Sequence, residues 1–221
     1  MAMLIEELHT HFLECSGTCT DTRQVQEGAM FFALQGPNFD ANVFAMKALE
    51  AGCRYAVIDD PAIAIDARFL LVQDVLGTLQ QLARFHRGLF NLPVIAITGS
   101  NGKTTTKELM NAVLAADRPT LATEGNLNNH IGVPLTLLRL KAEHRAAVIE
   151  MGANKRGDIA ELCAIADPDH GLITNIGKAH LEGFGSVEGV IATKTELYEH
   201  LRARNGIVLV NSDDDLLMSH S

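Results

Sequence analysis

The sequence has no excess of basic residues and no long apolar run. Among its 221 residues, 18 Lys and Arg stand against 27 Asp and Glu, which gives a net charge of −9 at pH 7. Proteins that hold nucleic acid by bulk charge have basic surfaces, so we expect no nucleic-acid partner. No segment has the ~18 consecutive apolar residues of a membrane-spanning helix, so we expect no membrane insertion. The start, Met1–Glu7, has two acidic and no basic residues, which argues against a signal peptide and predicts a cytoplasmic location.

Cysteine is also scarce. The chain has four, with no Cys-x-x-Cys pair among them: Cys15, Cys19, Cys53 and Cys163. In a chain without an export signal, reduced thiols are the expected state. Two of these cysteines lie with His9 and His11 within eleven residues, a composition that can hold zinc. The spacing matches no standard zinc finger and no second Cys/His pair lies nearby, so we predict no metal there.

The chain does contain enough apolar side chain to form folded cores. Hydrophobic residues make up 47% of it and charged residues 20%, unlike disordered chains. Its length allows one large domain or two small ones. Residues 28–58 show the pattern of a β-α-β unit, and a helical pattern over 74–89 stops at Asn91-Leu-Pro93. We therefore predict two α/β domains, 1–92 and 93–221.

After Pro93, strand-like runs alternate with helix-length segments. Strands are predicted at 94–98, 120–123, 147–150, 171–176 and 207–210, and helices from 103, over 132–140, from 157 and over 187–203. Such alternation is typical of an α/β fold in which helices cover both faces of a mostly parallel sheet. The last segment, 211–221, begins as a polar loop and stops, so we expect this domain to be incomplete. Its acidic run, Asp213–Asp215, is expected to be a solvated loop.

The strongest local signal is a glycine-rich loop between a predicted strand and a predicted helix. In that setting, backbone N–H groups and a helix N-terminus cradle phosphates, a Lys reaches the β and γ oxygens, and a Thr hydroxyl binds Mg²⁺. The full G-x-x-x-x-G-K-[ST] pattern is not met, because Ile97 stands where its first glycine would be. We nevertheless predict a nucleotide phosphate site. It is formed by Gly99, Ser100, Asn101, Gly102, Lys103, Thr104 and Thr105.

Further polar residues are expected at the carboxyl edge of the same sheet, where ligands of open α/β folds gather. Glu150 ends a predicted strand, so its carboxylate can bind Mg²⁺; the alternative is a capping or solvated acid. His180 follows the strand that ends at 176, although a lone His is more often structural. Asn128 and Asn129 precede the helix predicted at 132–140, so they either face a substrate or cap that helix.

Several short motifs follow one another along the chain. They are Gly99-Ser-Asn-Gly-Lys-Thr-Thr105, Gly125-Asn-Leu-Asn-Asn129 with Ile131-Gly-Val-Pro-Leu135, Ile149-Glu-Met-Gly-Ala-Asn154, Ile173-Thr-Asn-Ile-Gly177 with Ala179-His180, and Lys194-Thr-Glu196. In this order they resemble the Mur ligases of peptidoglycan synthesis, which are ATP-dependent amide-bond-forming enzymes. Within that family, the likeness is greatest to the members that add D-alanyl-D-alanine to UDP-N-acetylmuramoyl-tripeptide. The likeness extends from about Asp21 to Asp214.

The resemblance implies a reaction and a role for particular residues. The γ-phosphoryl of ATP passes to a substrate carboxylate, and an amine then displaces phosphate from the acyl phosphate. Lys103 would steady the β and γ phosphates, and Thr104 with Glu150 would hold one Mg²⁺. His180 would bind a second Mg²⁺. Lys194 is expected to be carbamylated, which needs a neutral amine; burial can lower the pKa of a lysine enough for this, whereas a helical Lys is otherwise a surface charge.

The N-terminal segment resembles the UDP-binding domain of the same family. The likeness rests on Asp21-Thr-Arg23, Gly28 and Phe31-Phe-Ala-Leu-Gln-Gly36. Thr22 and Arg23 would contact the UDP, because a guanidinium pairs well with phosphate oxygens; the alternative is a turn and a surface arginine. Ala41 departs from the family, which usually has Gly there. Mur ligases are much longer than this chain, so their C-terminal domain is absent and we expect the fragment to bind ligands without turnover.

Three alternatives stay open at this stage. One is a ligase that adds the third amino acid of the peptide, which the motif from Glu150 to Asn154 disfavours. Another is folylpolyglutamate synthase, which the UDP-type N-terminal segment disfavours. The third is a nucleotide-binding switch without ligation chemistry, which has no reason to bind UDP. We expect a monomer, and the sequence does not specify the third residue of the bound peptide.

Overall fold

The computed structural model describes residues 3–177 and 184–221. By its internal contacts the chain divides into two compact units, Met1–His86 and Arg87–Ser221, so the division falls a little before the boundary expected at residue 92. No helix within the described ranges combines the length and the apolar character that crossing a membrane requires. Each unit contains its own parallel sheet.

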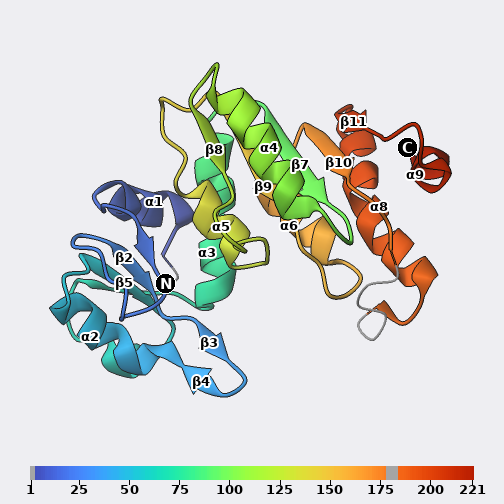
Figure 1. The fold of residues 1–221 in the computed structure, drawn as a ribbon. Coiled ribbons are helices and arrows are strands. Elements are labelled where there is room, and N and C mark those ends of the chain that lie inside the picture. The colour runs from blue at the N-terminus through green and yellow to red at the C-terminus, as the bar shows by residue number, and fades with distance from the viewer. Residues whose placement is uncertain (1–2, 178–183) are drawn as a thin grey trace. The chain divides into compact units, whose positions relative to one another are not determined.

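The first unit is built on a parallel sheet with the strand order β1-β2-β5-β6. Figure 1 labels its two central strands, β2 and β5. The strands are β1 (Thr18–Cys19), β2 (Met30–Phe32), β5 (Tyr55–Ile58) and β6 (Phe69–Leu71). The predicted β-α-β unit is confirmed, since α2 (Ala45–Glu50) connects β2 to β5. Buried alanines of α2 and the buried rings of Phe31 and Phe69 share one core on this face of the sheet.

Two longer helices belong to the first unit, α1 (Ile5–Leu13) and, except for its last two residues, α3 (Val75–Gly88). The helical pattern predicted over 74–89 is confirmed by α3, and Asp74 Oδ1 accepts the Leu76 N–H at its start (3.0 Å). His9, a member of the His/Cys cluster near the start of the chain, lies on α1 with its Nε2 3.0 Å from Nδ1 of His86. His9 also packs against Phe85, with ring centroids 5.0 Å apart, so it takes part in the packing of α1 on α3.

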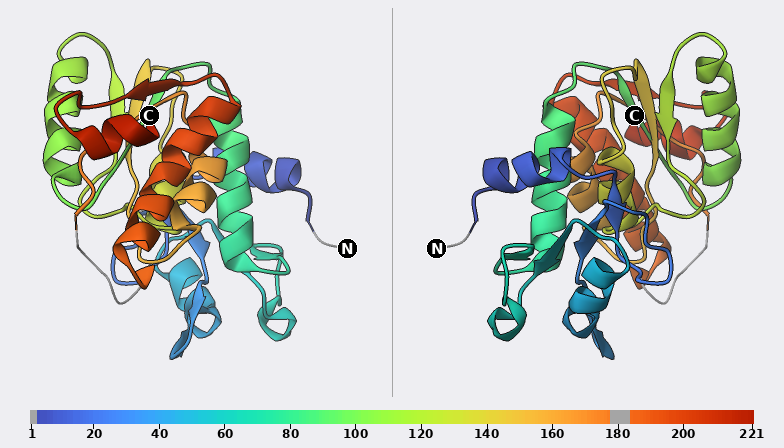
Figure 2. Two further views of the ribbon diagram at one scale, coloured as in Figure 1. Left: turned by 90° about the vertical axis from the view of Figure 1, so that its right-hand side faces the viewer. Right: turned by 90° about the vertical axis from the view of Figure 1, so that its left-hand side faces the viewer.

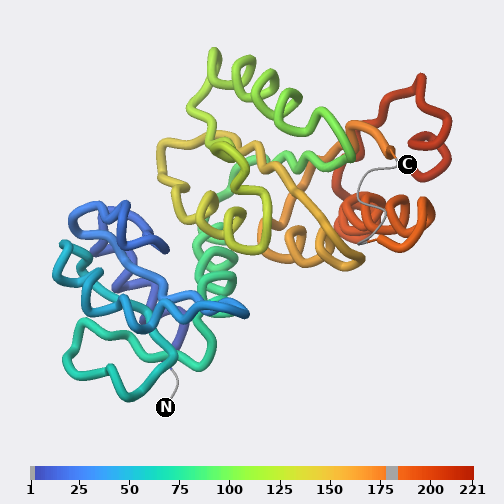
Figure 3. The backbone as a smooth tube through the Cα atoms, turned by 60° about the horizontal axis from the view of Figure 1, so that its bottom comes forward, coloured from blue at the N-terminus to red at the C-terminus, as the bar shows by residue number. Residues whose placement is uncertain are grey.

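Short elements connect these parts. The turn predicted at 35–38 is a small antiparallel hairpin that extends from the sheet (Figure 3). Its strands are β3 (Gln35–Gly36) and β4 (Phe39–Asp40), and the 3₁₀ helices η1 (Ala41–Phe44) and η2 (Pro61–Ile63) follow. The sequence pattern had not predicted this hairpin, β1 or β6, because strands of two or three residues are too short to show a period. The nine-residue helix α1 was also not predicted.

The second unit has five parallel strands in the order β11-β10-β7-β9-β8, which confirms the predicted α/β fold. The strands are β7 (Val94–Thr98), β8 (Thr120–Ala122), β9 (Ala146–Glu150), β10 (His170–Ile173) and β11 (Ile207–Leu209). The strand predicted over 171–176 is therefore shifted, since β10 ends at Ile173. β7 lies between β9 and β10, so the strands that follow it are added first on one side of β7 and then on the other. The segment after β7 therefore lies at a topological switch point, where open α/β sheets usually bind ligands.

Helices cover both faces of this sheet. Figure 2 shows α4 (Lys103–Ala115) on one face and α6 (Asp158–Ala166) with α8 (Val187–Ala203) on the other. α5 (Gly132–Leu137) is shorter than the predicted helix. The solvated loop predicted at 213–215 is confirmed for Asp213 and Asp214, whereas the exposed Asp215 is the first residue of α9 (Asp215–His220). Asp214 Oδ1 accepts the N–H groups of Leu216 and Leu217 at the start of this helix.

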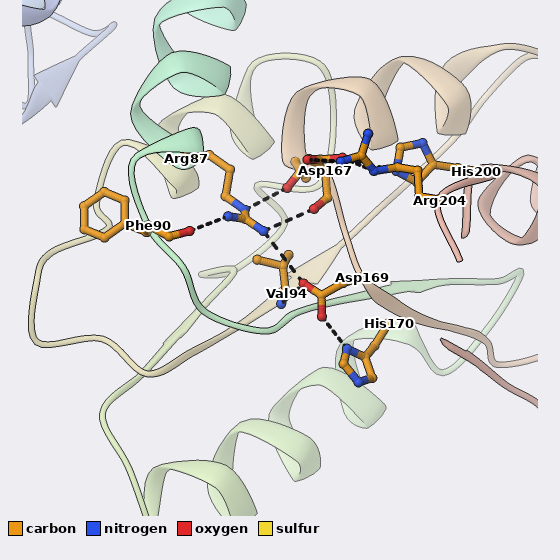
Figure 4. Close-up of polar contacts among 9 residues, drawn as sticks. Arg87, Phe90, Val94, Asp167, Asp169, His170, His200 and Arg204 are labelled. Atoms are coloured by element: carbon orange, nitrogen blue, oxygen red, sulfur yellow. Dashed lines mark hydrogen bonds and ion pairs between the residues drawn. The ribbon is translucent and has the colours of Figure 1, made fainter. Parts of the chain in front are cut away.

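A buried arginine fastens the end of α6 in the second unit (Figure 4). The side chain of Arg87 is only 10% exposed. Its guanidinium donates to the carbonyl oxygens of Ala166 (3.1 Å), Phe90 (2.9 Å) and Asp167 (3.2 Å). These acceptors include C-terminal carbonyls of α6 that have no partner within the helix, so Arg87 satisfies them and opposes the negative end of the helix dipole.

Candidate nucleotide and magnesium site

The glycine-rich loop, residues 99–102, connects the buried strand β7 to α4. Gly99 has φ +139°, and a Cβ built there would lie 2.0 Å from Thr174 Oγ1, so no other residue fits. Gly102 has φ +79°, a left-handed conformation that glycine adopts without a steric penalty. These two glycines set the sharp turn from strand to helix.

The loop is held against the end of β10 by hydrogen bonds to residues 175–177. Ser100 N–H donates to Asn175 O (3.0 Å), and Asn101 N–H donates to Asn175 Oδ1 (3.1 Å). Gly177 N–H donates in turn to Ser100 Oγ (2.9 Å). The conformation of the loop is therefore fixed by the protein before any ligand binds, which lowers the entropic cost of binding.

The start of α4 presents backbone N–H donors for an anion. The first intrahelical bond is made by Thr106 N–H to Gly102 O (2.9 Å), so the N–H groups of residues 103–105 precede the helical ladder. They point from the positive end of the helix dipole, which is a phosphate-binding arrangement. Lys103 Nζ donates to the loop carbonyls of Gly99 (2.9 Å) and Ser100 (3.4 Å), so this cation lies within the loop.

Glu150 lies beside this loop, at the carboxyl end of β9, and is only 1% exposed. Its Oε1 accepts hydrogen bonds from Thr104 Oγ1 (3.2 Å) and Asn128 Nδ2 (2.7 Å). Its Oε2 is buried and has no hydrogen-bond partner among residues 3–177 and 184–221. Burying a carboxylate oxygen without a partner is costly, so an absent ligand is expected there.

This arrangement fits Mg²⁺. The ion prefers oxygen ligands and is usually held by one or two carboxylates together with substrate phosphates. Glu150 Oε2 supplies an unused carboxylate oxygen and Thr104 supplies a hydroxyl next to the phosphate-binding helix end. No group of three or more His, Cys, Asp or Glu side chains able to hold a metal occurs in the described part of the chain, which a site completed by phosphates does not require.

The two asparagines predicted near the site differ in their contacts. The side-chain amide of Asn128 donates to Glu150, and the backbone carbonyl oxygen of Asn128 accepts the Gly152 N–H (2.7 Å). Asn129 Oδ1 accepts the N–H groups of Ile131 (3.0 Å) and Gly132 (2.9 Å) at the start of α5. The side chain of Asn129 therefore caps the chain entering that helix, whereas Asn128 belongs to the carboxylate site.

Lys194 lies in the interior of the second unit, not on its surface. It is 3% exposed, so the interpretation as a solvated helical lysine is wrong. Burial, and next the positive charge of Lys103, lower the pKa of Lys194 to about 8. The ammonium lies 5.7 Å from the centroid of the Phe184 ring. At this pKa an appreciable fraction of the amine is neutral near physiological pH, as a carbamylation reaction requires.

A cavity of about 250 Å³ is lined by Lys103, Asn128 and Lys194, whereas Glu150 and Thr104 are not among its lining residues. Its lining includes the loop after β7, the asparagines after β8, the segment after β9, part of α6 and Lys194. The lining residues are Gly99, Ser100, Lys103, Asn128, Asn129, His130, Gly152, Ala153, Asn154, Asp158, Glu161, Leu162, Phe184 and Lys194.

Three polar members of this lining were not predicted from the sequence, namely His130, Asp158 and Glu161. Asp158 Oδ2 accepts the N–H groups of Asn154 (2.8 Å) and Lys155 (3.0 Å), so it shapes the segment that follows β9. The position of Asp158 in the sequence could have indicated its place in the site, because the segment that it shapes follows β9 and so begins at the same sheet edge as Glu150.

The remaining predicted residues lie elsewhere. Thr22 and Arg23 follow β1 in the first unit. The Arg23 guanidinium pairs with Asp21 (2.6 Å) while its side chain remains 85% exposed. This bonding holds the pKa of Asp21 down at about 2. His180 lies outside the described residues, so the structure does not test its predicted role.

Comparison with known proteins agrees with this geometry. The family model for the Mur ligase middle domain matches residues 97–220. The UDP-N-acetylmuramoyl-tripeptide–D-alanyl-D-alanine ligase of Escherichia coli is 42% identical over 209 residues, which cover 95% of this chain. The ligase of the same name from Haemophilus influenzae is 43% identical over 90% of this chain.

The chain belongs to the Mur ligase family. A crystal structure of MurF from Acinetobacter baumannii superposes with a TM-score of 0.85 at 37% identity, over 100% of this chain and 51% of that one. The MurF ligase of Thermotoga maritima, solved in complex with ADP, gives 0.84 at 36% identity, over 94% of this chain and 48% of that one. The chain spans less than half the length of the Escherichia coli and Haemophilus influenzae relatives, 46% and 44% respectively.

Proposed function

We propose that this chain forms the UDP-substrate-binding and nucleotide-binding parts of an ATP-dependent ligase that joins D-alanyl-D-alanine to UDP-N-acetylmuramoyl-tripeptide. The observation that carries the proposal is the meeting of Thr104 and Asn128 on one oxygen of the buried Glu150 carboxylate, beside a phosphate-binding loop, with its other oxygen unpartnered in the described residues. The names of the curated relatives support the substrates. The expected cytoplasmic location suits soluble substrates of this kind.

In the proposed reaction the terminal carboxylate of the tripeptide attacks the γ-phosphorus of ATP and ADP leaves. The amine of D-alanyl-D-alanine then attacks the acyl carbon, the C–O bond to phosphate breaks, and an amide forms with loss of a proton. The protein contributes mainly position and charge in such a phosphoryl transfer. The incoming amine and the adenine would be bound in part by regions beyond this chain, so we expect binding without turnover.

The residues around the glycine-rich loop suit these tasks. Lys103, together with the N–H groups at the start of α4, would hold the β and γ phosphates. Glu150 and Thr104 would hold one Mg²⁺, which when bound neutralises phosphate charge. The 2.7 Å hydrogen bond from Asn128 keeps the Glu150 carboxylate oriented. His180, with Lys194, is proposed to hold a second Mg²⁺ near the substrate carboxylate.

Carbamylation of Lys194 would reverse the charge of that side chain. The neutral amine adds to the carbon of CO₂ and loses a proton, giving an N-carboxylate with two oxygens. The lowered pKa of Lys194, about 8, and its place in the wall of the cavity support this proposal. The carbamate would also relieve the repulsion between two cations, Lys103 and Lys194, in one site.

In the first unit, Thr22 and Arg23 are proposed to contact the UDP diphosphate. The Arg23 guanidinium is exposed and fixed by Asp21, so it is already ordered for a phosphate. Asn129 is proposed as a weaker substrate contact, since its side-chain oxygen is already engaged in capping.

A thermal-shift titration tests the proposal. The chain is titrated with UDP-N-acetylmuramoyl-tripeptide, with the UDP-dipeptide precursor and with Mg-ATP. A ligand at 100 times its dissociation constant adds about 2.7 kcal/mol to the free energy of unfolding. The proposal expects the largest stabilisation by the tripeptide. Preference for the dipeptide would indicate a ligase that adds the third residue, and a response to Mg-ATP alone would indicate a nucleotide-binding module of another kind.

A further inference from the structure

Lys107 is a fully buried lysine in the helix that begins with the phosphate-binding loop. It lies one turn after Lys103 in α4, and its exposed fraction is 0%. Lysine is among the residues least often buried, because an ammonium taken out of water loses its hydration. A buried ammonium is therefore retained where specific partners replace that hydration, and those partners indicate what it does.

The partners of Lys107 lie on two sides. Its Nζ donates to the backbone carbonyl of Thr123 at 2.7 Å and to Glu108 Oε1 at 2.6 Å. The Glu108 side chain is 61% exposed, so it balances the charge from the solvent side. The Thr123 carbonyl, in contrast, is part of the segment that follows β8, so Lys107 connects α4 to that segment.

Thr123 is in direct contact with the strand that carries Glu150. Its N–H donates to Val148 O (3.1 Å), and its Oγ1 accepts the N–H of Glu150 (2.9 Å). The side chain of Thr123 is thus bonded to the backbone of the residue whose carboxylate forms the site. The same segment continues to Asn128, which donates to Glu150 Oε1.

A continuous path of hydrogen bonds follows from these contacts. It runs from Lys107 to the Thr123 carbonyl, and from the Thr123 hydroxyl to the backbone of Glu150. Both ends of the path belong to elements that shape the magnesium site, because α4 also carries Thr104. A shift of residues 123–128, the Thr123 segment, would move two partners of Glu150 together. These are the Thr123 hydroxyl, which accepts the Glu150 N–H, and Asn128, which donates to the Glu150 carboxylate.

We propose that Lys107 is a positioning residue for the magnesium-binding carboxylate: its ammonium holds the Thr123 segment so that Glu150 and Asn128 keep the arrangement that the ion requires. The inference rests on the proposed function, since it assigns Mg²⁺ to Glu150. Partners that orient a metal ligand typically contribute about 10–100-fold to metal affinity. Lys107 does not touch the ion or the nucleotide in this scheme.

The test measures the binding of Mn²⁺, which serves as a probe for Mg²⁺, in the presence of the non-hydrolysable nucleotide AMP-PNP. The electron paramagnetic resonance signal of the free ion reports how much Mn²⁺ stays unbound. Lys107→Met keeps the length of the side chain and removes the charge, and the exposed Lys141→Met is the matched control. The expected result is about tenfold weaker Mn²⁺ binding in Lys107→Met and no change in Lys141→Met. The affinity for AMP-PNP in EDTA should change less than about twofold, which a general loss of structure would not allow.

If circular dichroism shows that Lys107→Met is unfolded, a second pair of variants, at Thr123, tests the inference instead. Thr123→Val removes the hydroxyl that accepts Glu150 N–H, whereas Thr123→Ser retains it. Weaker Mn²⁺ binding is expected in Thr123→Val and is expected to be restored in Thr123→Ser. Wild-type Mn²⁺ affinity in folded Lys107→Met, or in Thr123→Val, overturns the inference alone. Failure of the unmodified chain to bind Mn²⁺ with AMP-PNP overturns the proposed function and this inference together.

Discussion

Asn128 Nδ2 donates a 2.7 Å hydrogen bond to Glu150 Oε1, which joins the segment after β8 to the end of β9. Thr104 Oγ1 donates to the same oxygen from the first turn of α4. Three segments that are separate in sequence therefore meet on one carboxylate oxygen and leave the other for a ligand. The proposed magnesium site depends on this arrangement.

The two neighbouring asparagines should behave differently when each is changed to alanine. Asn128→Ala removes a hydrogen bond to the proposed metal ligand, so Mg²⁺-dependent nucleotide binding should weaken about tenfold. Asn129→Ala removes a cap from the start of α5, so it should lower the free energy of unfolding by about 1 kcal/mol. Calorimetric titration with Mg-AMP-PNP and urea denaturation measure the two effects. Equal losses of nucleotide binding in both variants would contradict the distinction.

Lys194 should make stability depend on pH. Below about pH 8 the folded protein holds a buried ammonium at a cost, because burial lowers the pKa of Lys194. Between about pH 8 and 10.5 the unfolded chain binds this proton and the folded chain does not, so the free energy of unfolding rises with pH. In CO₂-free buffer, Lys194→Met should therefore be more stable than the unmodified chain at pH 7, and the difference should vanish above about 10.5. A constant difference across this range would show that Lys194 is not buried as a cation.

Carbamylation has a spectroscopic test. With ¹³C-labelled bicarbonate at pH 8, the chain should show a ¹³C carbamate resonance that Lys194→Arg lacks, because a guanidinium has no neutral amine to react. Lys155→Arg, at an exposed lysine, is the matched control and should retain the resonance. Retention of the signal in Lys194→Arg would mean that another amine, such as the N-terminus, is its source.

The buried arginine in Figure 4 should be important for the stability of the second unit. Arg87→Met leaves one buried carbonyl acceptor, that of Ala166, and two part-buried ones without their donor, so the free energy of unfolding should fall by about 2–4 kcal/mol. Arg204 pairs with Asp167 at 2.8 Å but is 55% exposed, so Arg204→Met should cost at most about 1 kcal/mol. Urea denaturation compares the two variants, and similar losses would refute the role assigned to Arg87.

Much of the fold follows from sequence periodicity. β7 and α8 begin and end where the pattern predicted them, because buried strands and long helices have clear periods. The hairpin at Gln35–Asp40 and the cap that Asp214 forms for α9 were missed, since each depends on a few hydrogen bonds and not on a repeating pattern. β10 ends early because residues 174–177 turn to bond the glycine-rich loop.

The site was only partly predictable. Sequence placed Thr104 and Glu150 at one edge of a parallel sheet, and the structure brings them within hydrogen-bond distance. Burial of Lys194 could not be deduced from the residues of a helix alone, because it depends on which face α8 turns toward α6. Lys107 was overlooked for the same reason, since its partner Thr123 is close in space only through the pairing of β8 with β9.

The most direct measurement of the central claim compares Glu150→Gln with Glu143→Gln, a change at an exposed glutamate, by calorimetric titration with AMP-PNP in Mg²⁺ and in EDTA. Glu150→Gln removes the buried carboxylate charge and keeps its shape. If Glu150 binds the magnesium that accompanies the nucleotide, this variant should lose at least about tenfold in affinity in Mg²⁺ and change little in EDTA, while Glu143→Gln matches the unmodified chain under both conditions. Equal affinity of Glu150→Gln and the unmodified chain in Mg²⁺ would contradict the claim that this carboxylate is the metal ligand of the site.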